Sequence, residues 1–167
     1  MKRRAYLAGL STGLTFGAAG CVGGEVVTSV TEDVIVDPGD YWATDLPAAG
    51  DGISYRIRAE RRFDVYVFAS QDSLDYYKQY INGGDPPEQP AGVDAHSSMA
   101  AKRGEMYEVA TKDEGSRESF DVDGAATFVV DHSDYRDEGA QLPENEAEAE
   151  PLSVFVDLEL TSSRLPF

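Results

Sequence analysis

Two segments of the chain alternate apolar and polar residues with a period of two. In residues 53–60, Ile53, Tyr55 and Ile57 fall on one side of the alternation and polar or charged residues on the other, and residues 154–160 repeat the pattern. Because successive side chains of a β-strand point to opposite faces, each segment predicts a strand with one buried face and one wet face. A sheet made of such strands must bury its apolar face against a second layer.

Other short segments rich in β-branched and aromatic residues predict further strands. They cover residues 25–36, 41–46, 63–69, 97–101, 105–111, 118–122 and 126–131. The segment 63–69 is apolar on both faces, which is typical of a central strand. Turn sequences separate several strands, as in Asp37-Pro38-Gly39-Asp40 and Asp123-Gly124. About eight or nine short strands predict a mainly β fold, a single antiparallel, jelly-roll-like β-sandwich over residues 25–167.

One short helix is predicted over residues 72–81. Leu74 and Tyr77 recur there at helical spacing behind a capping residue, either Asp72 or Ser73. We expect the helix to pack at one end of a sheet, with its tyrosines forming a lid over the sandwich edge.

Two loops interrupt the predicted sandwich. Residues 83–95 carry several prolines and glycines, and residues 136–151 are acidic and rich in alanine. Such compositions favour exposed connections over packed elements.

The charge balance is strongly acidic. Lysine and arginine number 14 against 31 aspartates and glutamates, which gives a net charge of −17. Such a surface repels phosphate backbones, so the sequence predicts no binding to nucleic acid. In molar salt the Debye length falls to about 3 Å, and repulsion among the carboxylates is then screened. We therefore expect a domain that needs salt for stability.

The N-terminus is organised as an export signal over residues 1–20. Positions 2–4 are Lys-Arg-Arg, an uncharged stretch follows over 5–19, and the chain's single cysteine is Cys21. As a helix the uncharged stretch would span only about 23 Å, less than the hydrocarbon core of a bilayer. A cleaved signal is favoured over a permanent membrane span.

The paired Arg3 and Arg4, followed by Ala5-Tyr6-Leu7, resemble a twin-arginine signal, and Ala18-Ala19-Gly20-Cys21 resembles a lipobox. With the acidic remainder, the chain resembles the twin-arginine-exported lipoproteins of haloarchaea. The resemblance implies a lipid on Cys21, a tether over residues 21–24 and a location on the extracellular side of the cell membrane.

The remainder also resembles a family of β-sandwich modules. Phe63-Asp64-Val65-Tyr66-Val67 and Phe128-Val129-Val130-Asp131-His132-Ser133 are similar to strands of the pre-peptidase C-terminal class found in secreted archaeal proteins. The resemblance spans approximately residues 34–160 and implies that both segments lie in the core sheets.

Attachment of a lipid to Cys21 would consume the only thiol. A blue-copper centre, a disulfide and a zinc–cysteine site are thereby excluded, since each needs a free thiol. We expect no cofactor.

Asp131-His132-Ser133-Asp134 is the most suggestive local cluster, because it offers a base, an orienting carboxylate and a hydroxyl. A small exported hydrolase using His132 is therefore an alternative. The favoured interpretation is a strand running into a polar turn, with no catalytic residue. His96, beside a proline-rich loop, is interpreted as a surface residue.

Carboxylates at neighbouring turns suggest a second alternative, a calcium-binding surface module. The residues involved are Asp121, Asp123, Asp131, Asp134, Asp137 and Glu138. The basic concentration Arg56, Arg58, Arg61 and Arg62 is expected to pair with acidic neighbours.

The sequence thus predicts a non-enzymatic, lipid-anchored envelope protein that serves as a binding or structural module. Its ligand or protein partner is not defined by any motif.

Overall fold

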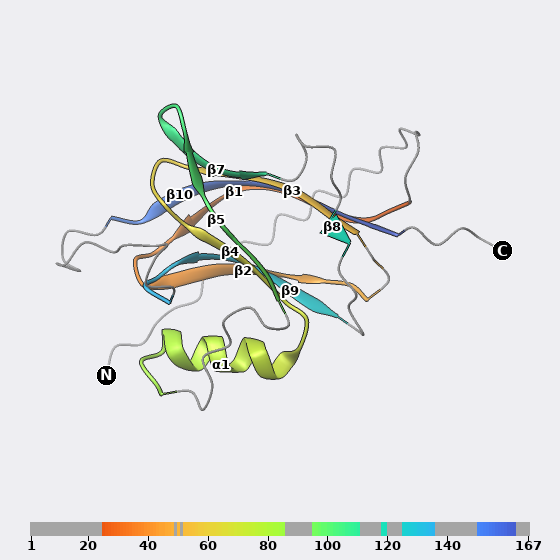
Figure 1. Ribbon diagram of the computed structural model, residues 1–167, viewed down its shortest axis with the longest axis horizontal. Coiled ribbons are helices and arrows are strands. Elements are labelled where there is room, and N and C mark those ends of the chain that lie inside the picture. The colour runs from red at the N-terminus through yellow and green to blue at the C-terminus, as the bar shows by residue number, and fades with distance from the viewer. Residues whose placement is uncertain are drawn as a thin grey trace.

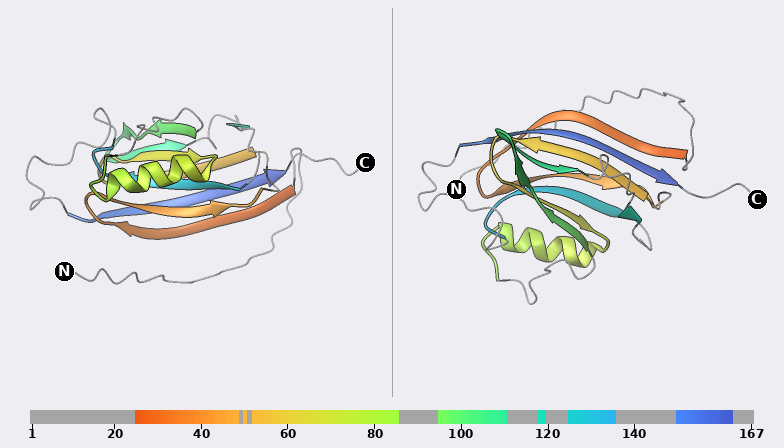
Figure 2. Two further views of the ribbon diagram at one scale, coloured as in Figure 1. Left: turned by 90° about the horizontal axis from the view of Figure 1, so that it is seen from below. Right: turned by 45° about the horizontal axis from the view of Figure 1, so that its top comes forward.

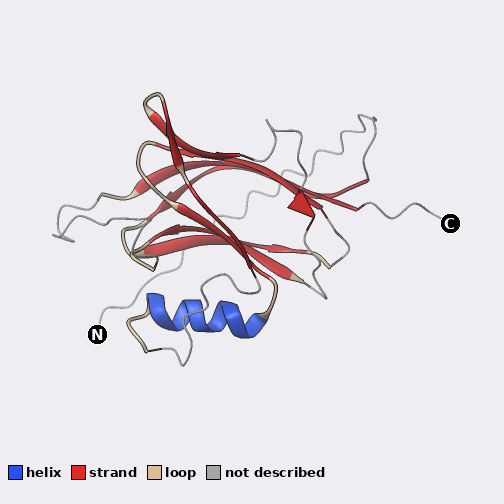
Figure 3. Cartoon of the chain, viewed as in Figure 1, coloured by secondary structure: helices blue, strands red, loops and turns tan. Residues whose placement is uncertain are grey.

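The computed structural model describes residues 25–48, 50, 52–85, 95–110, 118–119, 125–135 and 150–162. These residues form an antiparallel β-sandwich with one helix, which confirms the predicted fold class (Figure 1, Figure 3). The elements are β1 (Glu25–Val36), β2 (Asp40–Leu46), β3 (Gly52–Ala59), β4 (Asp64–Phe68), α1 (Gln71–Ile81), β5 (Ala95–Met99), β6 (Ala101–Arg103), β7 (Met106–Ala110), β8 (Glu118–Ser119), β9 (Ala126–His132) and β10 (Leu152–Ser162).

The strands form two sheets. A six-stranded sheet has the order β1-β10-β3-β7-β6, with β8 paired to β3, and a four-stranded sheet has the order β2-β9-β4-β5. Every described strand pairing is antiparallel. The first and last strands of the described chain, β1 and β10, therefore lie side by side.

The chain changes sheets where the sequence predicted one strand over 97–101. The strand β5 ends at Met99, and β6 begins at Ala101 in the other sheet. Between them, the N–H of Ala100 donates to Phe63 O at 3.1 Å. The buried Ala100 thus divides the predicted strand into two.

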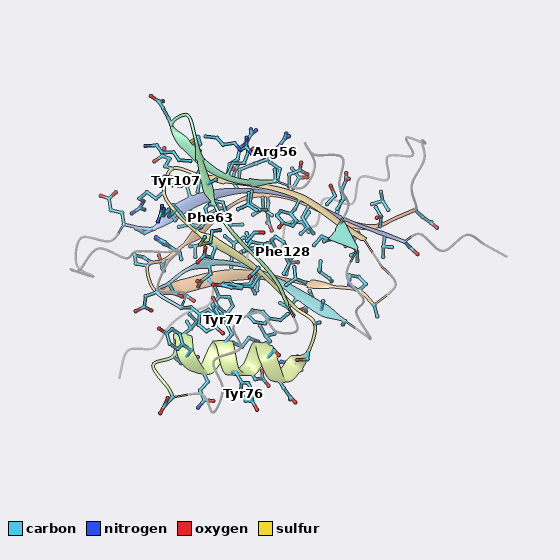
Figure 4. The ribbon with its side chains drawn as sticks, in the orientation of Figure 1. Arg56, Phe63, Tyr76, Tyr77, Tyr107 and Phe128 are labelled. Carbon is cyan, nitrogen blue, oxygen red and sulfur yellow. The ribbon has the colours of Figure 1, made fainter. Side chains whose placement is uncertain are left out.

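The main core lies between the sheets. The alternation of β3 and β10 buries Ile53, Tyr55 and Ile57 from one strand and Val156 and Leu158 from the other, all with 0% exposure. Their polar neighbours face outward, as the sequence predicted. Opposite them, Figure 4 shows Phe128 and Phe63 between the two sheets.

A second core lies on the other side of the four-stranded sheet, beneath α1. It contains Tyr66 and Phe68 from β4, Val129 from β9, and Leu74 and Tyr77 from the helix. The strand β4 is therefore apolar on both faces because it is covered on both, by the six-stranded sheet and by α1. Its predicted central position is confirmed by the order β9-β4-β5.

The position of the helix corrects the expectation from sequence. It covers the outer face of the four-stranded sheet and makes a third layer, whereas the sequence predicted packing at the end or edge of a sheet (Figure 1, Figure 2). The reason is the outward pair Tyr66 and Phe68, which α1 keeps from water.

The helix also begins earlier than predicted. Ser70 is its N-cap, in an extended conformation, and Ser70 Oγ accepts the N–H of Ser73 at 3.2 Å. Asp72, one of the predicted caps, instead lies in the first turn, where a negative charge complements the helix dipole.

Several predicted features lie outside the described residues. These are the signal over 1–20, Cys21 with its tether to residue 24, the Asp123-Gly124 turn, most of the 83–95 loop and residues 136–149 of the acidic insertion. The described ends of the loops, Gly84, Asp85, Glu150 and Pro151, are exposed.

Candidate functional site

The layer beneath α1 contains a pair of buried carboxyl groups. Asp64 of β4 and Asp131 of β9 are directly paired across the two strands, and both have 0% exposure. Two residues further along the pair of strands, Tyr66 and Val129 also stand opposite each other and belong to the core beneath α1. Because strand residues alternate, Asp64 and Asp131 face this same layer.

The helix and the turn after β9 both bind Asp131. Tyr77 of α1 donates its hydroxyl to Asp131 Oδ1 at 2.6 Å, and Ser133 donates its hydroxyl to the same oxygen at 2.7 Å. Ser133 Oγ in turn accepts the N–H of Tyr135 at 3.1 Å. One carboxylate oxygen therefore joins the helix, the strand and the turn (Figure 4, where Tyr77 points from α1 toward the sheet).

The surroundings favour the neutral form of Asp131. Burial raises its pKa from 3.8 to about 7, the hydrogen bonds from Tyr77 and Ser133 act in the opposite direction, and the negative charge of Asp64 raises it further. The pKa of Tyr77 is also raised, first by burial and then by the charge of Asp131. Near neutral pH, the carboxyl group of Asp131 is therefore close to half protonated.

Aromatic rings cluster around Tyr77 in the layer beneath α1. Tyr77 packs edge-on against Tyr41 of β2 with ring centroids 5.2 Å apart and against Tyr135 at 4.9 Å, and it lies 5.9 Å from Tyr66. Tyr80 of α1 packs against Tyr135 at 5.1 Å. The rings exclude water from the carboxyl groups, which strengthens every electrostatic interaction there.

This arrangement can hold a proton and fasten α1, and it is closed to solvent. Asp64, Asp131 and Ser133 are each at most 1% exposed, and Tyr77 is fully buried. A substrate would reach these groups only after α1 had moved.

The most suggestive sequence cluster does not assemble into a catalytic pair. His132 is 5% exposed and lies on the opposite face of β9 from Asp131, where its Nδ1 is 3.4 Å from Val36 O. Ser133 donates to Asp131 rather than to His132. Burial lowers the pKa of His132, which favours a neutral imidazole.

The carboxylates proposed for calcium are also divided. Asp131 is buried beneath α1, whereas Asp134 is exposed and accepts from the Tyr80 hydroxyl at 3.4 Å. Asp121, Asp123, Asp137 and Glu138 lie outside the described residues. Within the described ranges, no group of three or more His, Cys, Asp or Glu side chains is arranged to hold a metal ion.

The predicted pairing with an acidic neighbour is confirmed for Arg58, whereas Arg61 bonds to backbone carbonyl oxygens. Arg58 on the outer face of the six-stranded sheet forms an ion pair with Glu108 of β7, and Arg61 donates to the carbonyl oxygens of Glu150 and Pro151 at 2.6 and 2.8 Å. Arg56 lies on the same outer face (Figure 4).

The side chain of His96 lies outside the described part of the chain, although its backbone belongs to β5. In the described part of the chain, no helix has both the length and the apolar character needed to span a membrane.

Sequence reasoning missed the pairing of Asp64 with Asp131. The available signal was an aspartate at one end of an apolar strand in both Asp64-Val65-Tyr66-Val67-Phe68 and Phe128-Val129-Val130-Asp131. A charged residue in such a position is rarely buried unless it has a partner.

Comparisons of the chain with protein-family models, with curated proteins and with solved structures gave no match.

Proposed function

We propose that this protein is a lipoprotein of the cell envelope, held on the extracellular side of the cell membrane by a lipid on Cys21, and that its sandwich acts as a non-catalytic binding or structural module. One observation carries the proposal. The only cysteine follows a basic start and an uncharged stretch, and the first strand begins at Glu25, directly after Val22-Gly23-Gly24.

This spacing would hold the domain against the bilayer. An extended chain advances at most about 3.5 Å per residue, so three residues between Cys21 and Glu25 allow a separation on the order of 10 Å. Two lipid chains on the cysteine anchor a small domain without a spanning helix. The acidic surface would be repelled by anionic headgroups in dilute buffer, and a salt-rich medium removes that conflict.

The internal contacts of the polar side chains support a non-catalytic role. Tyr77 and Ser133 both donate to Asp131 in a closed layer, and the imidazole of His132 faces the carbonyl oxygen of Val36. Groups engaged in this way stabilise a fold. A module that binds a partner through its outer surfaces needs these buried polar groups only to stabilise the fold.

Export and anchoring can be tested in a salt-loving archaeon. Native protein from the membrane fraction should lack residues 1–20, and mass spectrometry should find a lipid on Cys21. Cys21→Ser should move the protein out of the membrane fraction. Arg3→Lys with Arg4→Lys should leave unprocessed protein inside the cell.

Arg61→Lys with Arg62→Lys provides the matched control, because it makes the same exchange in a paired arginine of the folded domain. This variant should be exported normally. An intact N-terminus on protein from wild-type cells, or an unmodified Cys21 thiol on a cytosolic species, would refute the proposal.

A further inference from the structure

The longest described strand, β1, lies at the edge of a sheet. In the described part of the chain, β1 pairs only with β10 and ends the order of the six-stranded sheet, and Figure 2 shows it at the margin of that sheet. It has 12 residues, whereas the strands at the other sheet ends, β6, β2 and β5, have 3, 7 and 5. An edge strand presents unpaired backbone N–H and C=O groups, so a long one can accept a further strand.

The side chains of β1 alternate between the two faces of the sheet. Val30 and Val34 pack against the main core, whereas Ser29, Thr31 and Asp33 are exposed on the outer face. A strand added beside β1 must keep this alternation, because residues directly opposite each other in a sheet share a face.

A β-bulge between Val26 and Thr28 changes the alternation at the start of β1. Val27 packs against the core, and Thr28 stands opposite the buried Leu160 of β10, so two consecutive residues face inward. The bulge thereby places Val26 on the outer face, the same face as Ile35. These two are the exposed large hydrophobic residues of β1, with exposed fractions of 53% and 67%.

A two-fold axis at Thr31 brings these exposed residues together across two copies of the strand. When a second β1 runs antiparallel with Thr31 opposite Thr31, Ser29 of each copy stands opposite Asp33 of the other. Beyond the bulge, Val26 of each copy then meets Ile35 of the other. Cross-strand apolar pairs of this kind stabilise a sheet, and each would occur twice.

Other positions of the axis fit less well. An axis between two residues would place inward side chains opposite outward ones. An axis at Glu32 would set that carboxylate directly opposite its own copy, and one at Val30 would set the apolar Val26 opposite Asp33. The strand is therefore complementary to a second copy of itself in the register centred on Thr31.

We propose that two copies of this protein associate through their β1 edges, antiparallel and centred on Thr31, and so join their six-stranded sheets into one continuous sheet. The inference does not depend on the lipid anchor, because it uses only residues of the folded domain.

Repulsion between the acidic copies makes this association depend on salt. On the inner face, the two Glu32 side chains lie diagonally across the axis, and diagonal neighbours in a sheet are about 7–8 Å apart. Molar salt, with a Debye length of about 3 Å, weakens their repulsion.

Disulfide trapping tests the register, using the full chain with Cys21→Ser in molar potassium chloride so that no native thiol remains. Thr31→Cys should give a covalent dimer on mild oxidation, because directly opposite residues have Cα atoms about 4.5–5.5 Å apart, within the range of a disulfide. Ser29→Cys is the matched control. It lies on the same exposed face, but its two copies would be about 13 Å apart along the strand and should not crosslink.

A mixture of Ser29→Cys chains with Asp33→Cys chains should form the covalent dimer again, because these positions stand opposite each other. Equal crosslinking of Thr31→Cys and Ser29→Cys would overturn the inference. So would the absence of crosslinking in all of these chains, which would leave the edge to another occupant, such as a strand of a different protein.

Sedimentation equilibrium of the Cys21→Ser chain without further substitutions should show a reversible monomer–dimer equilibrium in molar potassium chloride. Ile35→Glu should weaken the dimer about tenfold, because it removes both contacts with Val26. Met106→Glu, at an exposed hydrophobic residue of β7, should leave it unchanged. A monomer at every concentration up to about 1 mM, or a dimer that Ile35→Glu leaves intact, would overturn the inference.

Glu32→Gln should tighten the dimer, since it removes the one close pair of like charges. Asp33→Asn makes the same chemical change at the next residue, opposite the neutral Ser29, and should have a smaller effect. Equal effects of the two substitutions would contradict the register centred on Thr31.

Discussion

Asp131 and His132 are consecutive in β9, yet their side chains lie in different layers of the domain. Asp131 is bonded to Tyr77 beneath α1, and His132 lies on the other face, with Nδ1 3.4 Å from Val36 O. Alternation along the strand separates them. Burial favours the neutral form of both groups, and these two preferences have opposite consequences for stability as pH changes.

The first prediction concerns this opposition. The pKa of Asp131 is raised to about 7 in the folded state, so its contribution to stability is full below about pH 4 and is lost as pH rises toward 7. The pKa of His132 is lowered from 6.5, so the unfolded chain binds its proton more readily, and stability is lost as pH falls below 6.5.

Denaturant unfolding in molar salt should separate the two effects. His132→Asn should leave a free energy of unfolding that falls as pH rises from 5 to 7. Asp131→Asn should leave one that rises over the upper part of that range. Parallel pH profiles for the two variants would contradict the prediction.

The second prediction concerns the Tyr77 hydroxyl. Tyr77→Phe keeps the ring contacts and removes the donor to Asp131, so the free energy of unfolding should fall by about 1–3 kcal/mol. The loss should be larger at pH 8 than at pH 5, because the hydroxyl bonds more strongly to a charged carboxylate. Urea unfolding at both pH values measures it.

Tyr76→Phe is the control for this substitution. Tyr76 is partly exposed and points away from the sheet (Figure 4), so its hydroxyl should change stability by less than about 0.5 kcal/mol. If both variants lost the same free energy of unfolding, the hydrogen bond to Asp131 would not account for the effect of Tyr77→Phe.

The sequence predicted the sandwich because apolar and polar residues alternate clearly in the strands that have one face exposed to water. Ile53, Tyr55 and Ile57 in β3 and the matching residues of β10 left no ambiguity. The apolar opposite face of β4, with Tyr66 and Phe68, also predicted burial on both sides. What covers that face was not predictable, because a local pattern records that a side chain is buried and does not identify its partner.

The same limit explains the missed acid pair. Asp64 and Asp131 are far apart in the sequence and meet only through the register of β4 with β9. Conversely, the sequence suggested Asp131 and His132 as one candidate catalytic cluster because they are adjacent in the chain. Strand geometry separates neighbours and joins distant residues, so a candidate site in a β-protein depends on register that the sequence alone does not provide.

The third prediction concerns Gly50, which precedes β3. A Cβ built on this residue would overlap the side chain of Leu160 in β10, which is 1% exposed. Gly50→Ala should therefore lower the free energy of unfolding by about 1–3 kcal/mol through overpacking.

Leu160→Ala removes the overlapping atoms and tests the mechanism. By itself it should destabilise the core, but Gly50→Ala should cost much less in that background than in the wild type. A double-mutant cycle measures the difference, and additive effects would show that the steric explanation is wrong.

The last prediction concerns salt. The full chain has a net charge of −17, so the folded domain brings many carboxylates close together, and their repulsion is weakened as the Debye length falls from about 10 Å at 0.1 M to about 3 Å at 1 M. The melting temperature should therefore rise steeply between 0.1 M and several molar potassium chloride. Sucrose stabilises folded proteins by exclusion from their surface and provides no screening, so it should not replace the salt at low ionic strength. A melting temperature that is independent of salt, or one that sucrose restores fully, would show that screening of the acidic surface is not what stabilises this fold.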